Sequence, residues 1–156
     1  MNSPAKKDGF TIIEVVLVLA IAGLIFLIVF LAVPALQRSQ RDTQRKNDLS
    51  RFMAQINSYQ ANNRGNVPAH TQAGIETAPN GLVPAYLTVG GDTFEDPNGG
   101  AYQFQYNSGS AVPSGQIRYS TNARCGANGA ISGGGTSRQV AASIGLEGGG
   151  GYCQQN

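Results

Sequence analysis

Histidine, cysteine and net charge are all scarce in this chain of 156 residues, and each scarcity narrows the range of functions. The single histidine, His70, has no cysteine or paired acid near it in the sequence, so the pattern of a metal site or of a nucleophile and its base is missing. The runs "GGGT" and "GGGG" lack the strand, the helix and the basic residue of a phosphate-binding loop. We therefore expect a protein that is not an enzyme, with His70 at its surface.

The positive charge of the chain is small and mostly local. A net charge of +2 gives no reason to expect nucleic acid as the main ligand, and DNA binding would depend on three scattered arginines, Arg118, Arg124 and Arg138. Residues 38–51 hold five basic side chains against two acidic ones. This segment fits contact with lipid headgroups, pairing with acidic groups of a neighbour, or a solvated helix face.

Charge is absent from residues 15–36, a run of 22 residues without a charged or hydrogen-bonding side chain. As a helix this run would be roughly 33 Å long, enough to cross a hydrocarbon core of about 30 Å. The short, polar and basic segment before it is typical of a cytoplasmic flank, which places the rest of the chain outside the cytoplasm. Glu14, at the head of the run, is unexpected, because an acid at a helix centre disfavours insertion by about 2.5–3.5 kcal/mol. A helix dipole that stabilises an acid at the N-terminus is one explanation.

The two cysteines, Cys125 and Cys153, lie in the polar part of the chain. An even count behind an export-type N-terminus favours a disulfide in an oxidising compartment, with a pair of buried free thiols as the alternative. The end of the chain, "GLEGGGGYCQQN", is rich in glycine. Side-chain packing is therefore scarce there, and we expect the bridge to anchor the end of the chain.

The pattern predicts an α+β fold. One helix is expected from near Phe10 to residues 62–65, with an apolar half at 10–36 and an amphipathic half at 37–64. In the second half the apolar positions recur at intervals of three and four: Leu49, Phe52, Met53, Ile56 and Tyr59. A loop at 65–100, with one helical turn at "LVPAYL", is broken by proline and glycine.

Residues 101–156 are expected to form a small antiparallel sheet of three or four strands, packed on the amphipathic half of the helix. "AYQFQY" (101–106) sets aromatic residues on one face, and "QIRYS" (116–120) is its antiparallel partner. A further strand is expected at "RQVAASIGL" (138–146).

The N-terminal stretch "KKDGFTIIEVVLVLAIAGLI" resembles the class III signal of type IV prepilins and pseudopilins. The matching elements are a short basic leader that ends in Gly9, Phe10 as the first mature residue, Glu14 as the fifth, and an apolar helix behind them. The resemblance implies a ladle-like pilin fold, with residues 1–9 as a leader that prepilin peptidase removes. It also implies N-methylation of Phe10 and a single-pass location in the inner membrane before assembly.

The resemblance further implies a homo-oligomeric helical filament on the cell surface, built with the help of pilus assembly membrane proteins. In its core, Glu14 would pair with the amino group of Phe10 on a neighbouring subunit and so set the register. Gly23 and Pro34 are candidates for loosening or bending the helix. Close helix contact at Gly23 and a simple kink at Pro34 are the alternatives.

Two features separate the possible relatives. The segment "TFEDPNGGAYQFQY" (93–106) resembles that of major pseudopilins of type II secretion systems, in which a nearby acidic loop often holds calcium. Four side chains are candidate ligands, with a simple turn capped by Asp96 as the alternative: Asp92, Glu95, Asp96 and Asn98. A cysteine-bounded C-terminal region resembles that of type IV pilins instead, so a pilin is favoured.

Three alternatives to a surface pilin stay open. They are a type II secretion pseudopilin, a DNA-uptake pilin, and a soluble secreted domain that an ordinary signal peptidase releases after Ala35, at the end of "AVPA".

Overall fold

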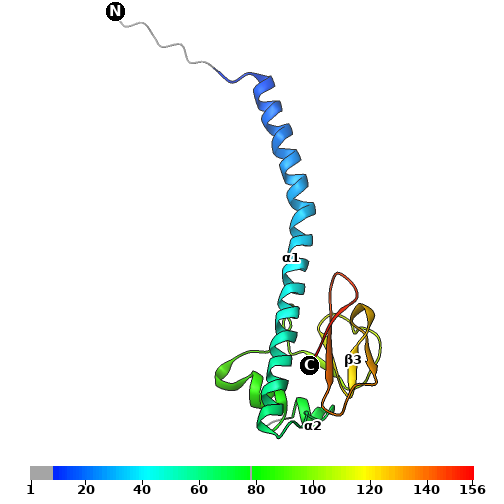
Figure 1. The fold of residues 1–156 in the computed structure, drawn as a ribbon. Helices are drawn as coiled ribbons and strands as arrows, with labels where there is room; N and C mark the ends of the chain where they lie inside the picture. The colour runs from blue at the N-terminus through cyan, green and yellow to red at the C-terminus, as the bar shows by residue number, and fades with distance from the viewer. Residues whose placement is uncertain (1–8, 78) are drawn as a thin grey trace, which may run out of the picture. The chain divides into compact units, whose positions relative to one another are not determined.

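The computed structural model describes residues 9–77 and 79–156, so the expected leader, apart from Gly9, lies outside the described residues. The chain divides into two compact units, Met1–Gln37 and Arg38–Asn156. The first unit holds the apolar half of the predicted helix. The second holds every element of the sheet (Figure 1).

The predicted long helix is confirmed as α1, Ile12–Asn62, which starts two residues later than expected and includes Pro34. It ends as the sequence predicts. The N–H of Gly65 donates to the carbonyl of Gln60 at 2.7 Å, and Gly65 adopts a φ of +81°. This left-handed conformation at a helix C-terminus favours glycine, because other side chains are strained there.

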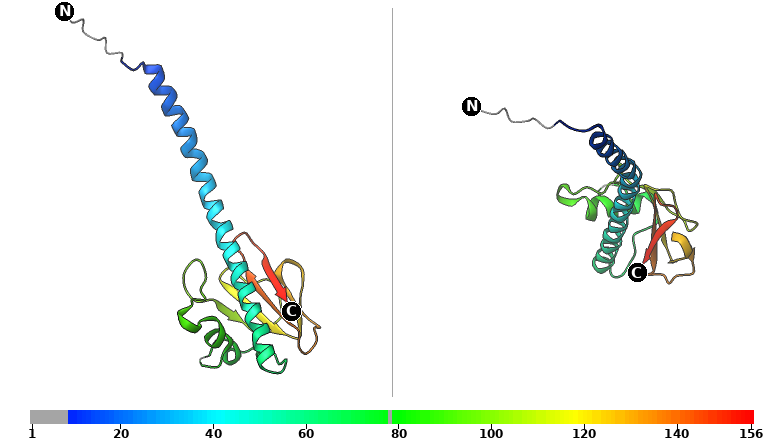
Figure 2. Two further views of the ribbon diagram at one scale, coloured as in Figure 1. Left: turned by 60° about the vertical axis from the view of Figure 1, so that its left-hand side comes forward. Right: turned by 90° about the horizontal axis from the view of Figure 1, so that it is seen from above.

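The core of the second unit forms between α1 and the sheet. The predicted apolar face of the helix is confirmed: Leu49, Phe52 and Ile56 are fully buried, and Met53 nearly so. Figures 1 and 2 show this part of α1 lying along the sheet. Phe52 is central, with its ring centroid 5.8 Å from that of Tyr119 and 5.6 Å from that of Phe104. The fold is therefore α+β, with an amphipathic helix packed on a small sheet.

Four strands form the main sheet, in the order β1-β2-β5-β6. Their bounds are β1 Gln103–Gln105, β2 Gln116–Thr121, β5 Val140–Gly145 and β6 Gly151–Gln155. The pairs β2–β5 and β5–β6 are antiparallel. The predicted aromatic face of 101–106 is confirmed, since Tyr102, Phe104 and Tyr106 all pack against the core.

The prediction that 101–106 and 116–120 pair antiparallel is wrong, because β1 and β2 are parallel, with Gln103 beside Gln116 and Gln105 beside Arg118. Residues 106–115 do not fold back as a hairpin. They cross to form a bridge between Gly109 and Ile131 before β2 begins. Parallel neighbours need such a crossover, and nothing in the composition of this flexible segment distinguishes it from a hairpin loop.

Strand β5 is buried along its whole length, because both faces of the sheet are covered there. On one face Val140, Ala142 and Ile144 join the core with α1. The other face is covered by a two-stranded hairpin that the sequence did not predict, made of β3 (Ala123–Cys125) and β4 (Ile131–Gly133) with the short turn η3 (Ala127–Gly129) between them. Ala141 packs against this hairpin. A strand buried on both faces explains the run of small and apolar residues in "VAASIG".

The expected loop between the helix and the sheet contains three short helical segments, α2 Gln72–Ile75, η1 Val83–Leu87 and η2 Val89–Gly91. The turn predicted at "LVPAYL" is η1. The loop is held down by apolar side chains buried in the main core: Ile75, Leu82 and Leu87.

The predicted disulfide is confirmed. Cys125 and Cys153 are joined, with their Cα atoms 5.8 Å apart, and the bridge ties β3 to β6. The bridge anchors the C-terminus as expected, and a second anchor adds to it, because β6 also pairs with five residues of β5. Gln154 of β6 donates to Ser50 of α1 at 3.0 Å. Backbone pairing does not need large side chains, so the glycine-rich sequence concealed this strand.

We expect the double substitution Cys125→Ser and Cys153→Ser to lower the free energy of unfolding by about 3–4 kcal/mol. The bridge closes a loop over a separation of 28 residues, and the loss of that closure frees the unfolded chain. The domain should still fold, because the ladder of β6 remains. Thermal unfolding of the full chain in detergent, followed by near-ultraviolet circular dichroism, measures the effect. A reducing agent should produce the same loss in the wild type and none in the double variant; an equal melting temperature for both proteins would contradict the prediction.

Candidate functional site

The carboxylate of Glu14 caps the N-terminus of α1. Its Oε2 accepts hydrogen bonds from the backbone N–H of Thr11 at 2.9 Å and from the Thr11 hydroxyl at 2.8 Å. Thr11 precedes the first helical residue and Glu14 is the third, which is the spacing of a capping box. The pattern T-x-x-E is readable in the sequence and was not used to predict the cap. It explains how an acid is accommodated at this end of the apolar helix in a single chain.

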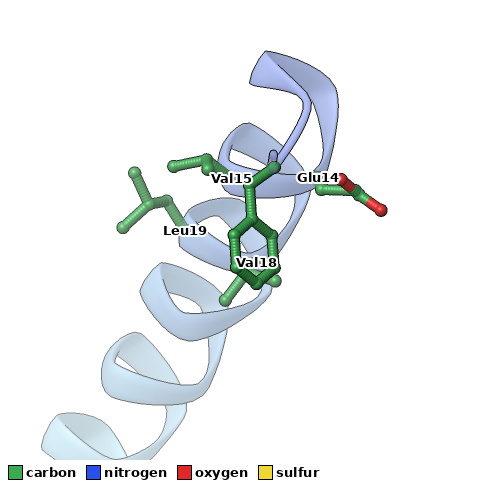
Figure 3. A pocket seen from close by; sticks show the side chains of 5 residues that line it. Glu14, Val15, Val18 and Leu19 are labelled. Carbon is green, nitrogen blue, oxygen red and sulfur yellow. The ribbon is translucent and has the colours of Figure 1, made fainter. Parts of the chain in front are cut away.

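A pocket of about 310 Å³ lies beside this cap, lined by Phe10, Glu14, Val15, Val18 and Leu19. In Figure 3 the carboxylate of Glu14 points to the opposite side of the helix from Leu19. All but one of the lining side chains are apolar. The first turns of the helix thus combine one carboxylate with an apolar surface, and a neighbouring apolar helix can pack against that surface.

The predicted cleavage junction is accessible. Phe10 is 91% exposed, and among the described residues no heavy atom beyond Gly9 and its chain neighbour lies within 4 Å of the position that a Cβ on Gly9 would take. The remainder of the leader lies outside the described residues. A peptidase could therefore reach the Gly9–Phe10 bond without unfolding any element that the structure describes.

The large apolar side chains between residues 10 and 36 are 43–91% exposed. Among the described residues, α1 is the one helix long and apolar enough to cross a membrane. Neither Gly23 nor Pro34 interrupts it, and the space around Gly23 is open. A surface of this kind is stable only against lipid or other apolar helices. The loosening predicted at Gly23 and Pro34 is not seen in this structure and stays a prediction for the filament.

A buried ion network in the second unit was missed from the sequence. The guanidinium of Arg45 is fully buried and donates to both carboxylate oxygens of Asp96, at 2.7 and 2.9 Å. It also contacts Glu147 at 2.8 Å and Asp42 at 3.1 Å. Arg41 forms a two-pronged pair with Glu147 at 2.7 and 2.8 Å. We call these five residues the Arg45 network. It ties α1 to the loop before β1 and to the turn between β5 and β6.

The Arg45 network favours the ionised forms of Glu147 and Asp96. Hydrogen bonds from Arg41, and then from Arg45, lower the pKa of Glu147 to about 2. Burial alone would raise the pKa of Asp96, but hydrogen bonds from Arg45 and from the N–H of Asn98 hold it below its usual value. The pKa of Arg45 is raised, chiefly by its hydrogen bonds to Asp96. The charges of Glu147, Asp96 and Arg45 are thus present at neutral pH.

Pairing within the domain accounts for three of the five basic residues between 38 and 51. Arg41 and Arg45 pair with acids of their own domain, and Arg51 lies 3.0 Å from Asp92 and donates to the carbonyl of Leu87 at 2.7 Å. None of the three interpretations of the sequence anticipated pairing within the domain. Arg38 is exposed.

The four calcium candidates are not assembled into an oxygen cage. Both oxygens of Asp96 accept from Arg45, Asp92 pairs with Arg51, and the amide of Asn98 donates to Glu147 at 3.0 Å. Glu95 is exposed. Among residues 9–77 and 79–156 no group of three His, Cys, Asp or Glu side chains is arranged to hold a metal ion. The turn proposed as the alternative is present, because the N–H of Asn98 donates to Oδ1 of Asp96.

The remaining candidates from the sequence are His70 and three arginines, and they do not form one site. His70 is exposed, and its Nδ1 lies 2.7 Å from the hydroxyl of Thr121. The side chain of Arg118 is partly buried and donates to Gln105 at 2.8 Å. Arg124 and Arg138 instead line one pocket at the surface. The structure thus brings together two of the three arginines that the sequence singled out.

Comparison with known proteins bears on the N-terminal segment alone. The family model described as "Prokaryotic N-terminal methylation motif" matches residues 4–30, which include Gly9, Phe10, Glu14 and Gly23. No significant match was found among curated proteins or among solved structures. The motif implies processing by a prepilin peptidase and assembly in a pilus system.

The matched segment contains the accessible Gly9–Phe10 junction, the capped Glu14 and most of the exposed apolar helix described above. Residues 4–30 therefore carry the class III signal peptide motif of type IV pilins, and this motif supports a type IV pilin-like or pseudopilin precursor.

Proposed function

We propose that the chain is a structural subunit of a type IV pilus-like extracellular filament, with assembly rather than catalysis as its activity. The observation that carries the proposal is the methylation motif followed by a helix whose large apolar side chains are all exposed between residues 10 and 36. This surface needs an apolar partner at every stage. Lipid of the inner membrane would cover it before assembly, and the helices of neighbouring subunits would cover it in the filament.

In this proposal prepilin peptidase cuts between Gly9 and Phe10, and the new amino group of Phe10 is methylated. Pilus assembly membrane proteins then move the chain from the membrane into the filament at the cell surface. The carboxylate of Glu14 pairs with the amino group of a neighbouring subunit's first residue. Because a misplaced subunit would leave that charge uncompensated, the pair would select one stagger between neighbours.

A type II secretion pseudopilin is the second candidate, favoured by the likeness of residues 93–106 to that family. Two observations support the pilin instead. Cys125 and Cys153 close the C-terminal region, and the guanidinium of Arg45 pairs with Asp96 where a calcium ion was considered. Electron microscopy of cells, with antibody against this chain, separates the two: long surface filaments labelled along their length support the pilin, and unlabelled or absent filaments support the pseudopilin.

We expect the mature protein to begin at Phe10 and to carry one added methyl group. Mass spectrometry of the protein purified from cells that make a prepilin peptidase measures both. A Gly9→Val substitution should leave the leader attached, because the side chain would occupy the space beside the cut, which is open in the wild type. Gly23→Val is the matched control and should still be cleaved. A chain that begins at Leu36 would instead assign the segment to ordinary signal peptidase and overturn the proposal.

A further inference from the structure

A second pocket, of about 310 Å³, lies in the second unit, and none of its lining residues is used in the proposed function. It is lined by Arg124 of β3, by Thr136, Arg138 and Gln139 from the segment between β4 and β5, and by Asn156 after β6. Segments that are distant in the sequence therefore meet at one surface site. Two of its five lining residues have a positively charged side chain, and none has an acidic side chain.

The two guanidinium groups in this pocket have spare donors. Arg124 uses its Nε in a hydrogen bond to the amide oxygen of Gln139 at 3.2 Å. Among the described residues, no side chain forms an ion pair with Arg124 or with Arg138, since the ion pairs found there involve Arg41, Arg45 and Arg51. Two like charges in one pocket repel each other, and an anion bound between them would offset this repulsion.

Hydrogen bonds fix the frame of the pocket. The amide oxygen of Gln139 also accepts from the backbone N–H of Thr136 at 3.3 Å. The side chain of Asn156 accepts from the N–H of Val140 at 2.9 Å and donates to the carbonyl of Arg138 at 3.3 Å. These bonds hold the floor of the pocket without using the terminal guanidinium nitrogens.

The Arg138 guanidinium lies beside Gly65, at the end of α1. Its Cζ lies 3.3 Å from the point that a Cβ on Gly65 would occupy, so the planar group packs against the backbone at the end of α1. A guanidinium held on one face keeps its N–H groups directed in the plane. Less conformational entropy of the Arg138 side chain is then lost when an ion binds.

We propose that this pocket binds a tetrahedral oxyanion, a phosphate or sulfate group. The guanidinium fork matches two oxygens of such a group, and two forks can contact one doubly charged ion from different sides. The hydroxyl of Thr136 supplies a further donor. The group comes either from a free inorganic ion or from a monoester on a larger molecule, since the pocket exceeds the volume of one ion and is open to solvent at its exposed rim residues Arg124, Thr136 and Arg138.

Titration of the full chain in non-ionic detergent with sodium phosphate and with sodium sulfate tests the proposal. Chloride keeps the ionic strength constant, and nuclear magnetic resonance follows the Nε–H signals of the arginines. We expect saturable shifts at Arg124 and Arg138. Arg124→Gln and Arg138→Gln should each weaken binding by about tenfold, through the loss of one charged hydrogen-bonding group. Arg38→Gln removes the same charge from an exposed arginine outside the pocket and should leave binding unchanged.

Several results would overturn the proposal. One is a set of shifts that do not saturate, and another is equal shifts with chloride. A third is binding that Arg38→Gln weakens as much as Arg138→Gln does. Each of these would show that the anion only screens positive charge in general. Arg138→Lys keeps the charge but not the fork, and its binding should fall between those of the wild type and Arg138→Gln. The circular dichroism of each variant should match the wild type, since these arginines are exposed.

Glucose 6-phosphate in the same titration separates the two sources of the group. Binding as tight as that of the free ion, and lost in Arg138→Gln, supports an esterified phosphate as the ligand. Exclusion of the sugar phosphate, with the free ion still bound, supports the inorganic ion. Both results support the oxyanion site, and neither depends on whether the chain forms filaments.

Discussion

Replacement of Arg45 by methionine is expected to lower the free energy of unfolding of the domain by about 3–5 kcal/mol. The change leaves the buried carboxylate of Asp96 without the two hydrogen bonds that compensate its charge, and it removes one partner of Glu147. Loss of one member of a buried ion network usually costs this much, because the remaining charge stays in a poorly solvated place. The loss is a large part of the 5–15 kcal/mol that typically stabilises a domain.

Urea unfolding of the full chain in detergent at pH 7, followed by near-ultraviolet circular dichroism, measures this loss. Arg38→Met is the matched control, since Arg38 is an exposed arginine on the same helix, and its substitution should change the stability by less than about 0.5 kcal/mol. Adding Asp96→Asn to Arg45→Met should recover part of the loss, since it removes the orphaned charge. Equal effects of the two single substitutions would show that the network contributes nothing.

The same comparison has a definite pH dependence. The pKa of Glu147 is lowered from 4.5 to about 2, and that of Asp96 is lowered as well. Groups with a lowered pKa stabilise the fold above their unfolded pKa, and this contribution is lost as the pH falls through the folded value. The difference between the wild type and Arg45→Met should therefore shrink between pH 4.5 and 2. Burial raises the pKa of Asp48, which acts in the opposite direction, but it does so in both proteins.

The place of Arg45 was readable in the sequence, but its partners were not. It precedes Leu49 by four residues and Phe52 by seven, so it lies on the buried stripe of the helix. A charged residue on that stripe predicts a buried pair. Asp42 lies only three residues before it, but Asp96 and Glu147 are 51 and 102 residues further along the chain, and local patterns carry no information about contacts at such separations.

The strands of the sheet show the same limit of prediction from local sequence patterns. Strands with clear alternation or a dense apolar run, such as 140–145, were predicted from the sequence, whereas β3, β4 and β6 are rich in small or polar residues and were not. Their pairing depends on backbone hydrogen bonds and on the bridge between Cys125 and Cys153. The signal segment was the easiest to read, because a peptidase recognises consecutive residues and the motif is therefore entirely local.

Glu14→Gln is expected to abolish filaments while leaving cleavage and folding intact. Glutamine at the third helical position can still accept from the N–H of Thr11, so the capping box of α1 is kept and only the charge is lost. In the proposed filament the amino group of a neighbouring Phe10 would then lie uncompensated in an apolar core. A penalty of about 3–5 kcal/mol at each contact lowers the association constant by more than about a hundredfold.

The capping box provides the control that separates these two roles of Glu14. Thr11→Ala removes the hydroxyl that donates to Glu14 but keeps the carboxylate, so it should weaken the helix end slightly and leave the filaments intact. Glu14→Ala removes both the cap and the charge and should match Glu14→Gln in filament yield. Yields are measured by shearing filaments from cells and quantifying the chain, with the mature N-terminus checked by mass spectrometry. If Glu14→Gln assembles normally while Thr11→Ala and Glu14→Ala do not, the carboxylate acts on its own helix, and the register between subunits is set by the apolar surface around Val15, Val18 and Leu19 instead.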